Sequence, residues 1–308
     1  MRTWRFPGTL GVVLAVAALT AAATGAAQPL PLLPGLNDKP TGLSIPGKFV
    51  WADLFAEDVD AAKRFYSGLL GWSWRTFGSG ADEYHVAYAN GRPVAGLVYR
   101  KPKVPEDARA VWIMYASAAN PAGVESAVAK SGGATMVSPV NVPYRGIHAI
   151  FSDRDGALFG VLRSSTGDPA DYRAEDGEWV WTHLFTRNPR AAAVFYSQLL
   201  EFEVIDYTVS EIPDDVVLAS AGHARAGVGA MGADAPDDVR SAWVGFLRVA
   251  DVDSSANRAE ALGGQVMVRA ELDTVDGQVA ILTDGAGAVF GLMSLDFEGA
   301  MAPREEAE

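Results

Sequence analysis

Hydrophobic positions along the chain follow two different periods. Between residues 59 and 70 the apolar side chains recur every three or four positions, which predicts an amphipathic helix. That apolar face consists of Ala62, Phe65, Tyr66, Leu69 and Leu70. Residues 83–89 instead alternate between apolar and polar side chains and lead into Asn90-Gly91, a dipeptide typical of a tight turn between antiparallel strands. The pattern therefore predicts helices together with antiparallel strands, which is the α+β class.

An Asp or Asn marks the start of four predicted helices. In each case an apolar strand leads to a residue whose side chain can accept N–H groups of the first helical turn. These caps are Asp58, Asn120, Asn188 and Asp251. A proline, which suits the first helical position, directly follows the second and third of them. The regular spacing predicts four copies of one unit, in the order strand–helix–strand–strand–strand.

The chain also contains a tandem duplication. The segment FYSGLL at 65–70 recurs as FYSQLL at 195–200, and GALFGV at 156–161 recurs as GAVFGL at 287–292. The segment 51–55 likewise recurs at 181–185. Because the register holds from residue 51 to residue 161 with a single one-residue slip, the two halves derive from one domain that holds two units.

The first 47 residues differ from the duplicated part. Residues 1–27 begin with Arg2 and Arg5, continue as an apolar run and end in small residues, which predicts an export signal cleaved before Gln28. An uncleaved membrane anchor is the alternative, because residues 8–27 carry no charge. Residues 28–47 contain five prolines and predict a linker. The remaining order is a first domain at 48–164, a linker at 165–176, a second domain at 177–296 and an acidic tail at 297–308.

Composition argues against several kinds of function. The 308 residues include 25 Lys+Arg against 38 Asp+Glu, a net charge of −13 that disfavours nucleic acid and anionic membrane surfaces as partners. The absence of cysteine excludes disulfides, thiolate nucleophiles and cysteine metal sites. No dinucleotide-binding, phosphate-binding or nucleophile-elbow motif is present. Together with the predicted export signal, these exclusions lead us to expect a periplasmic or secreted monomer or homodimer whose partner is a small molecule.

The order of these motifs resembles the vicinal oxygen chelate superfamily, which includes glyoxalase I, the bleomycin-resistance proteins and the extradiol dioxygenases. The likeness rests on paired βαβββ units, the capped helix with its Phe-Tyr and Leu-Gly pairs, and the Asp-x-Asp-Gly turn at 153–156. It covers residues 48–164 and 177–295. The resemblance implies two domains, each a curved mixed sheet around a cup-shaped cavity. In metal-dependent members that cavity holds a divalent ion on ligands from the first and last strands of each unit.

The ligand positions that the resemblance implies hold no metal-binding side chain. They lie seven residues before each helix cap and four residues after the turn glycine of a last strand. These positions are Trp51, Ile113, Trp181, Val244, Gly160 and Gly291. The other two last strands, at 94–99 and 226–231, contain no acid, amide or histidine. We therefore expect no metal cofactor, with a divalent metal at a displaced position as the alternative.

Five residues are candidates for ligand binding. Side chains two apart in a strand share a face, so Asp53 should point the same way as Trp51, and His183 the same way as Trp181. A flat aromatic ring beside a polar group suits a planar, partly polar molecule. The same tryptophans could instead fill the cups as core. His148, on the apolar strand 147–151, is the fifth candidate and could bind a stray metal with Asp53.

The sequence is compatible with three functions. The first is an exported, metal-free protein that binds a small organic ligand in its cups. The second is an enzyme of the lyase, isomerase or dioxygenase type, using a displaced metal or acid–base chemistry by His183, Asp53 or Glu83. The third is a structural role with both cups filled. The sequence identifies no catalytic residue beyond these candidates.

Overall fold

The computed structural model of the protein describes residues 32–80, 83–102, 109–206, 215–232, 235, 239–271 and 277–295. The export signal expected at 1–27 and the tail expected at 297–308 lie outside these residues. Within the described ranges, no helix is both long enough and apolar enough to cross a bilayer.

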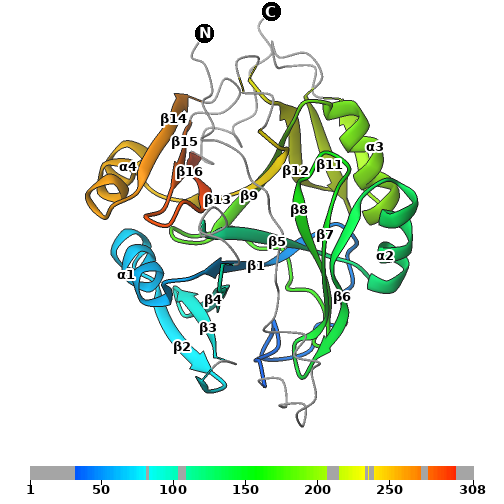
Figure 1. Cartoon of the computed structure of the whole chain (residues 1–308), viewed down its shortest axis with the longest axis horizontal. Helices are drawn as coiled ribbons and strands as arrows, with labels where there is room; N and C mark the ends of the chain where they lie inside the picture. The colour runs from blue at the N-terminus through cyan, green and yellow to red at the C-terminus, as the bar shows by residue number, and fades with distance from the viewer. Residues whose placement is uncertain are drawn as a thin grey trace, which may run out of the picture.

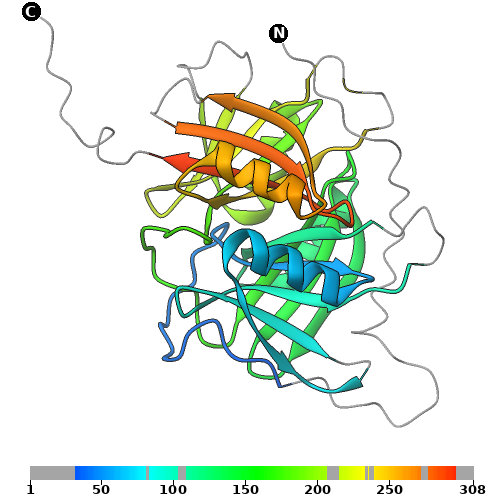
Figure 2. The same ribbon diagram turned by 90° about the vertical axis from the view of Figure 1, so that its left-hand side faces the viewer.

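Two eight-stranded sheets and four helices make up the fold (Figures 1 and 2). The first sheet contains β1 (Phe49–Ala56), β2 (Ser73–Phe77), β3 (Tyr84–Ala89), β4 (Arg92–Tyr99), β5 (Val111–Ser117), β6 (Ala134–Val142), β7 (Gly146–Ser152) and β8 (Leu158–Ser164). The second contains β9 (Trp179–Thr186), β10 (Glu203–Asp206), β11 (Val216–Ser220), β12 (His223–Ala230), β13 (Ala242–Arg248), β14 (Gln265–Glu271), β15 (Gly277–Thr283) and β16 (Val289–Leu295). The helices are α1 (Val59–Leu70), α2 (Pro121–Lys130), α3 (Pro189–Leu200) and α4 (Val252–Ala261).

Each sheet joins two units through their first strands. In the first sheet β1 and β5 pair antiparallel at the centre, and each also pairs parallel with the last strand of its own unit, β4 or β8. The strand order is therefore β2-β3-β4-β1-β5-β8-β7-β6, and the second sheet repeats it as β10-β11-β12-β9-β13-β16-β15-β14. This arrangement confirms the prediction of two tandem α+β domains, each a pair of βαβββ units in a curved mixed sheet.

Three of the four helix caps act as the sequence predicts. The carboxylates of Asp58 and Asp251 and the amide oxygen of Asn120 each accept a hydrogen bond from the backbone N–H three residues later. Asn188 makes no such bond, and α3 starts instead on the proline at its first position. The prediction that the Asn188 side chain caps α3 was therefore wrong, although the helix begins where it was expected.

The helical faces of the two sheets form two cores that each combine both domains. One core joins α1 and its strands to α4, through residues such as Phe65, Leu247 and Phe290. The other joins α2 to α3, through residues such as Phe159, Phe195 and Tyr196. Figure 1 shows α1 beside α4 on one side of the molecule and α2 beside α3 on the other. Each helix layer is thus buried against a unit of the other domain.

Two hydrogen bonds cross this boundary in the same way. The hydroxyl of Tyr66 donates to a carboxylate oxygen of Asp284 at 3.2 Å, and the hydroxyl of Tyr196 donates to Asp153 at 3.0 Å. Both tyrosines are fully buried. The other oxygen of each aspartate accepts backbone N–H groups of its own turn, before β8 or β16. The Phe-Tyr motif and the turn aspartate that carry the family resemblance therefore join the two domains.

The segment 32–47, called the N-terminal strap below, packs on the first domain. Leu33 and Leu36 are buried among apolar residues of the first sheet on the face away from the helices. The amide of Asn37 donates to the carbonyl oxygen of Gly167 at 2.9 Å, and the backbone N–H of Ile45 donates to the Asp168 carboxylate at 2.6 Å. The described part of the expected proline-rich linker is thus held by two leucines and by the segment that connects the domains.

Candidate functional site

The face of the first sheet that points away from the helices is called the first cup, and it contains a buried carboxylate. Asp53 on β1 accepts a hydrogen bond from the Trp51 indole N–H at 2.8 Å and one from the Tyr84 hydroxyl at 2.5 Å. The Tyr115 side chain, opposite Trp51 in the β1–β5 pair, also faces this carboxylate. These groups lie among apolar side chains that include Ile113. The first cup is therefore an apolar surface with one polar cluster.

Backbone geometry brings these groups together. A Cβ atom at Gly96 of β4 would lie 1.9 Å from the Tyr84 hydroxyl and 2.0 Å from an Asp53 carboxylate oxygen. At Gly160 of β8 the same atom would lie 2.2 Å from the Tyr115 ring. Side chains of β1, β3 and β5 thus occupy the space above glycines in the last strand of each unit. Any larger residue at Gly96 would displace the cluster.

Burial sets the protonation of the cluster. Burial raises the pKa of Asp53, and the hydrogen bonds from Tyr84 and Trp51 and the positive charge of Arg145 lower it in part. Burial and the neighbouring Asp53 charge raise the pKa values of Tyr84 and Tyr115 well above the ordinary value. Both hydroxyls therefore keep their protons at neutral pH and act as hydrogen-bond donors.

Arg145 is a fully buried cation beside this cluster. Its guanidinium carbon lies 4.0 Å from the centre of the Trp51 ring, a cation–π contact. None of its three guanidinium nitrogens has a hydrogen-bond partner among the described residues. The residue sits in the turn between β6 and β7, where Tyr144 and Gly146 on either side adopt positive φ angles of 62° and 123°. The turn thus directs a long cationic side chain under the sheet instead of into water.

His148 on β7 faces the same cup. Its ring lies 5.5 Å from the Tyr115 ring, and it shares a face with Ile150, a residue of the cup's apolar cluster. Burial lowers the pKa of His148 to about 3, and the positive charge of Arg145 contributes to this. The Nε2 atom of His148 has no hydrogen-bond partner within the described part of the chain. A neutral imidazole and a charged guanidinium thus both present unpaired nitrogens in one buried region.

The second cup carries different chemistry. His183 on β9 takes the place of Asp53, and its ring packs 4.4 Å from that of Phe185. A Cβ atom at Gly229 would lie 2.7 Å from the His183 Nε2 and 2.8 Å from a carboxylate oxygen of Asp215, so these two groups converge. Burial lowers the pKa of His183 to about 4. Trp181, two residues earlier, is half-buried against the apolar cluster of this cup.

The five residues proposed from the sequence therefore fall into two groups. Trp51, Asp53 and His148 meet in the first cup, while Trp181 and His183 lie in the second. Sequence reasoning missed Tyr84, Tyr115, Arg145 and Asp215. Tyr115 was within reach, because it stands two residues after the inferred ligand position Ile113, as Asp53 does after Trp51. Arg145 had one signal, its place in a Tyr-Arg-Gly turn directly before the strand of His148.

The alternative acid–base candidate Glu83 lies apart from both groups. Its side chain is exposed, and one of its carboxylate oxygens lies 3.8 Å from the Nε2 of His85. His85 alternates with Tyr84 along β3, so it faces the opposite side of the sheet from the polar cluster. The ring of His85 is instead paired with the Thr76 hydroxyl at 2.8 Å.

A divalent ion does not fit the positions that the fold would use. Trp51 and Ile113 present apolar or N–H groups, and the Tyr115 ring covers Gly160. Across the described ranges, no three His, Asp or Glu side chains converge in a way that could hold a metal. Hard divalent cations require several oxygen or imidazole ligands together. The residues at these positions therefore lack the donor set of a chelate site.

A comparison with protein families identifies the class. The model of the Glyoxalase/Bleomycin resistance protein/Dioxygenase superfamily matches residues 48–161 and 179–292. These two matches coincide with the two domains of the fold. The chain belongs to this superfamily, as a member with two tandem domains.

Particular relatives extend over nearly the same length. The chain is 30% identical over 246 residues to the putative glyoxylase CFP32 of Mycobacterium tuberculosis (strain CDC 1551 / Oshkosh), covering 79% of this chain and 93% of that protein. It is 30% identical over 266 residues to the anthracycline biosynthesis protein DnrV of Streptomyces peucetius, covering 81% of this chain and 94% of that one.

Solved structures show the same fold. The Mn(II)-bound glyoxalase from Novosphingobium aromaticivorans aligns with a TM-score of 0.55 at 18% identity, over 83% of this chain and 86% of that chain. The 2,3-dioxygenase LapB from Pseudomonas sp. KL28 aligns with a TM-score of 0.56 at 12% identity, over 86% and 96%. At these identities the likeness concerns the fold alone.

Proposed function

We propose that this protein binds a small organic molecule in its first cup, without the divalent ion used by metal-dependent members of the superfamily. The observation that carries the proposal is the buried cluster of Asp53, Tyr84 and Trp51 on an otherwise apolar face. Pockets for small molecules combine such apolar walls with a few fixed polar groups. A filled structural core has less reason to bury a carboxylate, because desolvation of a charged group is costly.

We propose binding without a metal because the residues at the expected ligand positions lack suitable donor atoms. Where chelating superfamily members would place ligands, this chain has Trp51 and Gly160, and the nearby carboxylate of Asp53 already accepts two hydrogen bonds. A relative that takes part, by its name, in anthracycline biosynthesis supports an organic small molecule as the ligand class.

Export forms part of the same proposal. Cleavage before Gln28 would leave the N-terminal strap complete, with Leu33 and Leu36 still in the mature protein. A protein matured in this way reaches the periplasm or the medium with its first cup covered as described. The strap and the proposed cleavage site are thus mutually compatible.

Calorimetry on metal-free protein tests this function. Purified protein from an exporting bacterial host is expected to begin at Gln28 on N-terminal sequencing. After EDTA treatment it should still bind members of a library of small aromatic compounds. Trp51→Leu should weaken that binding by about tenfold or more, roughly 1.4 kcal/mol, whereas the matched change in the other copy, Trp181→Leu, should not.

Several outcomes would overturn the proposal. One divalent ion per domain by elemental analysis, lost together with binding on chelation, would restore a metal-dependent function. Turnover of a bound compound that is abolished by His183→Gln would establish the enzyme alternative, which the convergence of His183 and Asp215 favours. Binding of no library member would leave the first cup as packed core.

A further inference from the structure

The guanidinium of Arg145, which has no hydrogen-bond partner among the described residues, indicates what kind of ligand the first cup binds. The side chain is fully buried, and its Nε, Nη1 and Nη2 atoms have no hydrogen-bond partner among the described residues. Buried charges in proteins are almost always paired, because leaving the hydration shell without compensation is expensive. An orphaned buried group of this kind calls for an explanation, and a bound ligand is one that supplies the missing partner.

The carboxylate of Asp53 is near but is not that partner. Its Oδ1 atom is engaged by the Trp51 indole and the Tyr84 hydroxyl at 2.8 and 2.5 Å. No hydrogen bond joins it to Arg145 among the described residues. The negative charge of Asp53 therefore acts on Arg145 only across a longer distance, and the N–H groups of the guanidinium remain unused.

Trp51 lies beside the guanidinium. The guanidinium carbon is 4.0 Å from the centre of the indole ring, a cation–π contact, and the N–H edge of the guanidinium makes no hydrogen bond among the described residues. That edge matches the two oxygens of a carboxylate in a bidentate pair. The neighbouring imidazole of His148 adds a second unpaired nitrogen on the same face of the sheet.

We propose that the ligand of the first cup is an organic acid whose carboxylate pairs with Arg145. This inference rests on the proposed function and names its ligand class. The remainder of the molecule would contact the apolar residues of the cup, such as Ile113 and Ile150. An aromatic monocarboxylate combines one charge for Arg145 with an apolar body for these walls.

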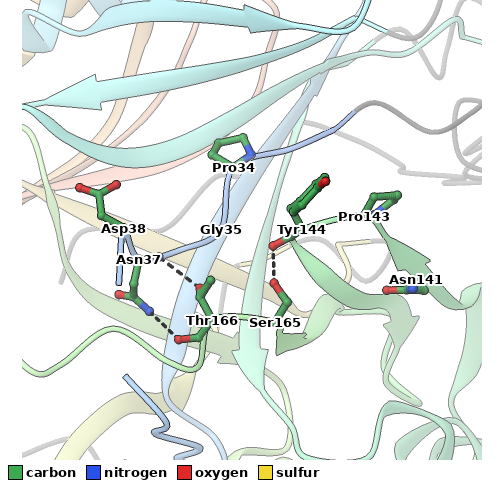
Figure 3. Close-up of a pocket in the computed structure, with 9 residues that line it drawn as sticks. All are labelled: Pro34, Gly35, Asn37, Asp38, Asn141, Pro143, Tyr144, Ser165 and Thr166. Atoms are coloured by element: carbon green, nitrogen blue, oxygen red, sulfur yellow. Dashed lines mark hydrogen bonds between the residues drawn. The ribbon is translucent and has the colours of Figure 1, made fainter. Parts of the chain in front are cut away.

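The surface is hollowed where the N-terminal strap meets the β6–β7 turn. Figure 3 shows Pro34 and Gly35 of the strap opposite Pro143 and Tyr144 of the turn. These residues line a hollow with a volume of about 680 Å³. Tyr144 directly precedes Arg145 in the chain. Leu33 and Leu36, on either side of Pro34 and Gly35, close the cup below. The hollow thus adjoins the turn that carries Arg145.

Benzoate and its neutral isostere benzamide provide the test on the full chain. The wild-type protein should bind benzoate about tenfold or more tightly than benzamide, because a charge-assisted pair is stronger than a neutral hydrogen bond. Arg145→Met should remove that preference, because both compounds then lose their contact with the guanidinium and benzoate loses the stronger one. Arg145→Lys, which retains the charge but not the planar fork, should retain part of the preference.

The stability of the free protein separates a binding role from a structural one. Replacement of an unpaired buried charge by an apolar side chain of similar size is neutral or stabilising, so Arg145→Met should melt at the wild-type temperature or above it. A lower melting temperature together with an unchanged benzoate preference would show that Arg145 is a structural partner of Asp53 and would overturn the inference.

The two proposals fail in different ways. If benzoate and benzamide bind equally and both are weakened by Trp51→Leu, the first cup binds small molecules but Arg145 does not select acids. If neither compound binds and no larger aromatic monocarboxylate does, while other library members bind, the inference is wrong and the proposed function stands; if no library member binds at all, both are wrong. Preference for benzoate that persists in Arg145→Met would place the anion elsewhere and would also overturn the inference.

Discussion

Burial determines the chemical state of single residues in the first cup. Tyr84 and Tyr115 donate hydrogen bonds because burial and the nearby Asp53 keep them protonated. His148 is neutral because the same low-polarity surroundings, and the adjacent Arg145, disfavour a second positive charge. The cup thus contains one cation, one carboxylate whose pKa is raised, and a set of neutral donors.

This state makes the stability of the protein depend on pH through His148. Burial lowers its pKa to about 3, whereas in the unfolded chain a histidine titrates near pH 6.5. Below pH 6.5 the unfolded state therefore binds more protons than the folded state, and stability falls as the pH falls. Between pH 6.5 and pH 5.0 the unfolding free energy of the wild type should therefore fall by about 1.5 kcal/mol more than that of His148→Gln. Urea denaturation at the two pH values measures both.

The control for this prediction is the exposed His223. His223→Gln, which removes an exposed histidine, controls for the loss of one histidine in general. His183, whose pKa burial lowers to about 4, acts in the same direction and is retained in both variants. Identical pH dependences for the wild type and His148→Gln would contradict a buried neutral imidazole at position 148.

The sequence could place some of these residues but not their assembly. Alternation along one strand is enough to put Asp53 on the same face as Trp51. The approach of Tyr84 and Arg145 depends on how three strands and a turn come together, and that depends on glycines such as Gly96 that leave room for side chains. Spacing along the chain carries little information about such contacts between elements.

Among the elements, the N-terminal strap differs most from its expected role. Its prolines indicate irregular backbone, which is correct, but composition alone does not reveal whether such a segment packs. Leu33 and Leu36 are buried because the sheet presents an apolar cluster that its own strands do not cover. The strap is therefore part of the first domain's core as well as a cover for its cup.

This placement predicts unequal effects of neighbouring leucines. Leu36→Ala should lower the unfolding free energy by about 2–3 kcal/mol, because it leaves a cavity under the strap. Leu32→Ala should change it by less than about 0.5 kcal/mol, since Leu32 is 62% exposed. Hydrogen–deuterium exchange in 32–47 should accelerate only in Leu36→Ala. Equal and small effects of both changes would show that the strap does not pack as described.

At the scale of the whole molecule, the duplication produces an approximate twofold arrangement in which each domain completes the other. The tandem repeat and the fold of each domain could be predicted from the sequence. The pairing of α1 with α4 and of α2 with α3 could not, because an apolar helix face is compatible with several partners. The choice depends on contacts such as the hydrogen bond from Tyr66 to Asp284, 218 residues away in the chain.

The two reciprocal tyrosines differ in the number of buried groups that they bind. Tyr66→Phe leaves the Asp284 carboxylate and the Trp112 indole N–H without their shared hydroxyl, whereas Tyr196→Phe removes the hydroxyl that donates to Asp153. Each lost partner of a buried polar group costs about 1–3 kcal/mol, so Tyr66→Phe should be the more destabilising change. Because the two tyrosines lie in different cores and share no hydrogen-bond partner in them, the double variant should lose about the sum of the two effects.

Urea unfolding followed by both circular dichroism and tryptophan fluorescence measures these changes and tests the shared cores. Tyr144→Phe, at an exposed position, is the control and should match the wild type. Since each helix layer is buried against the other domain, the wild type and both single variants should unfold in one transition, with the two probes coincident. Separate transitions for the two domains would mean that the interface cores contribute little. A common transition whose midpoint moves with Tyr66 and Tyr196 would instead show that the duplicated domains fold as one unit.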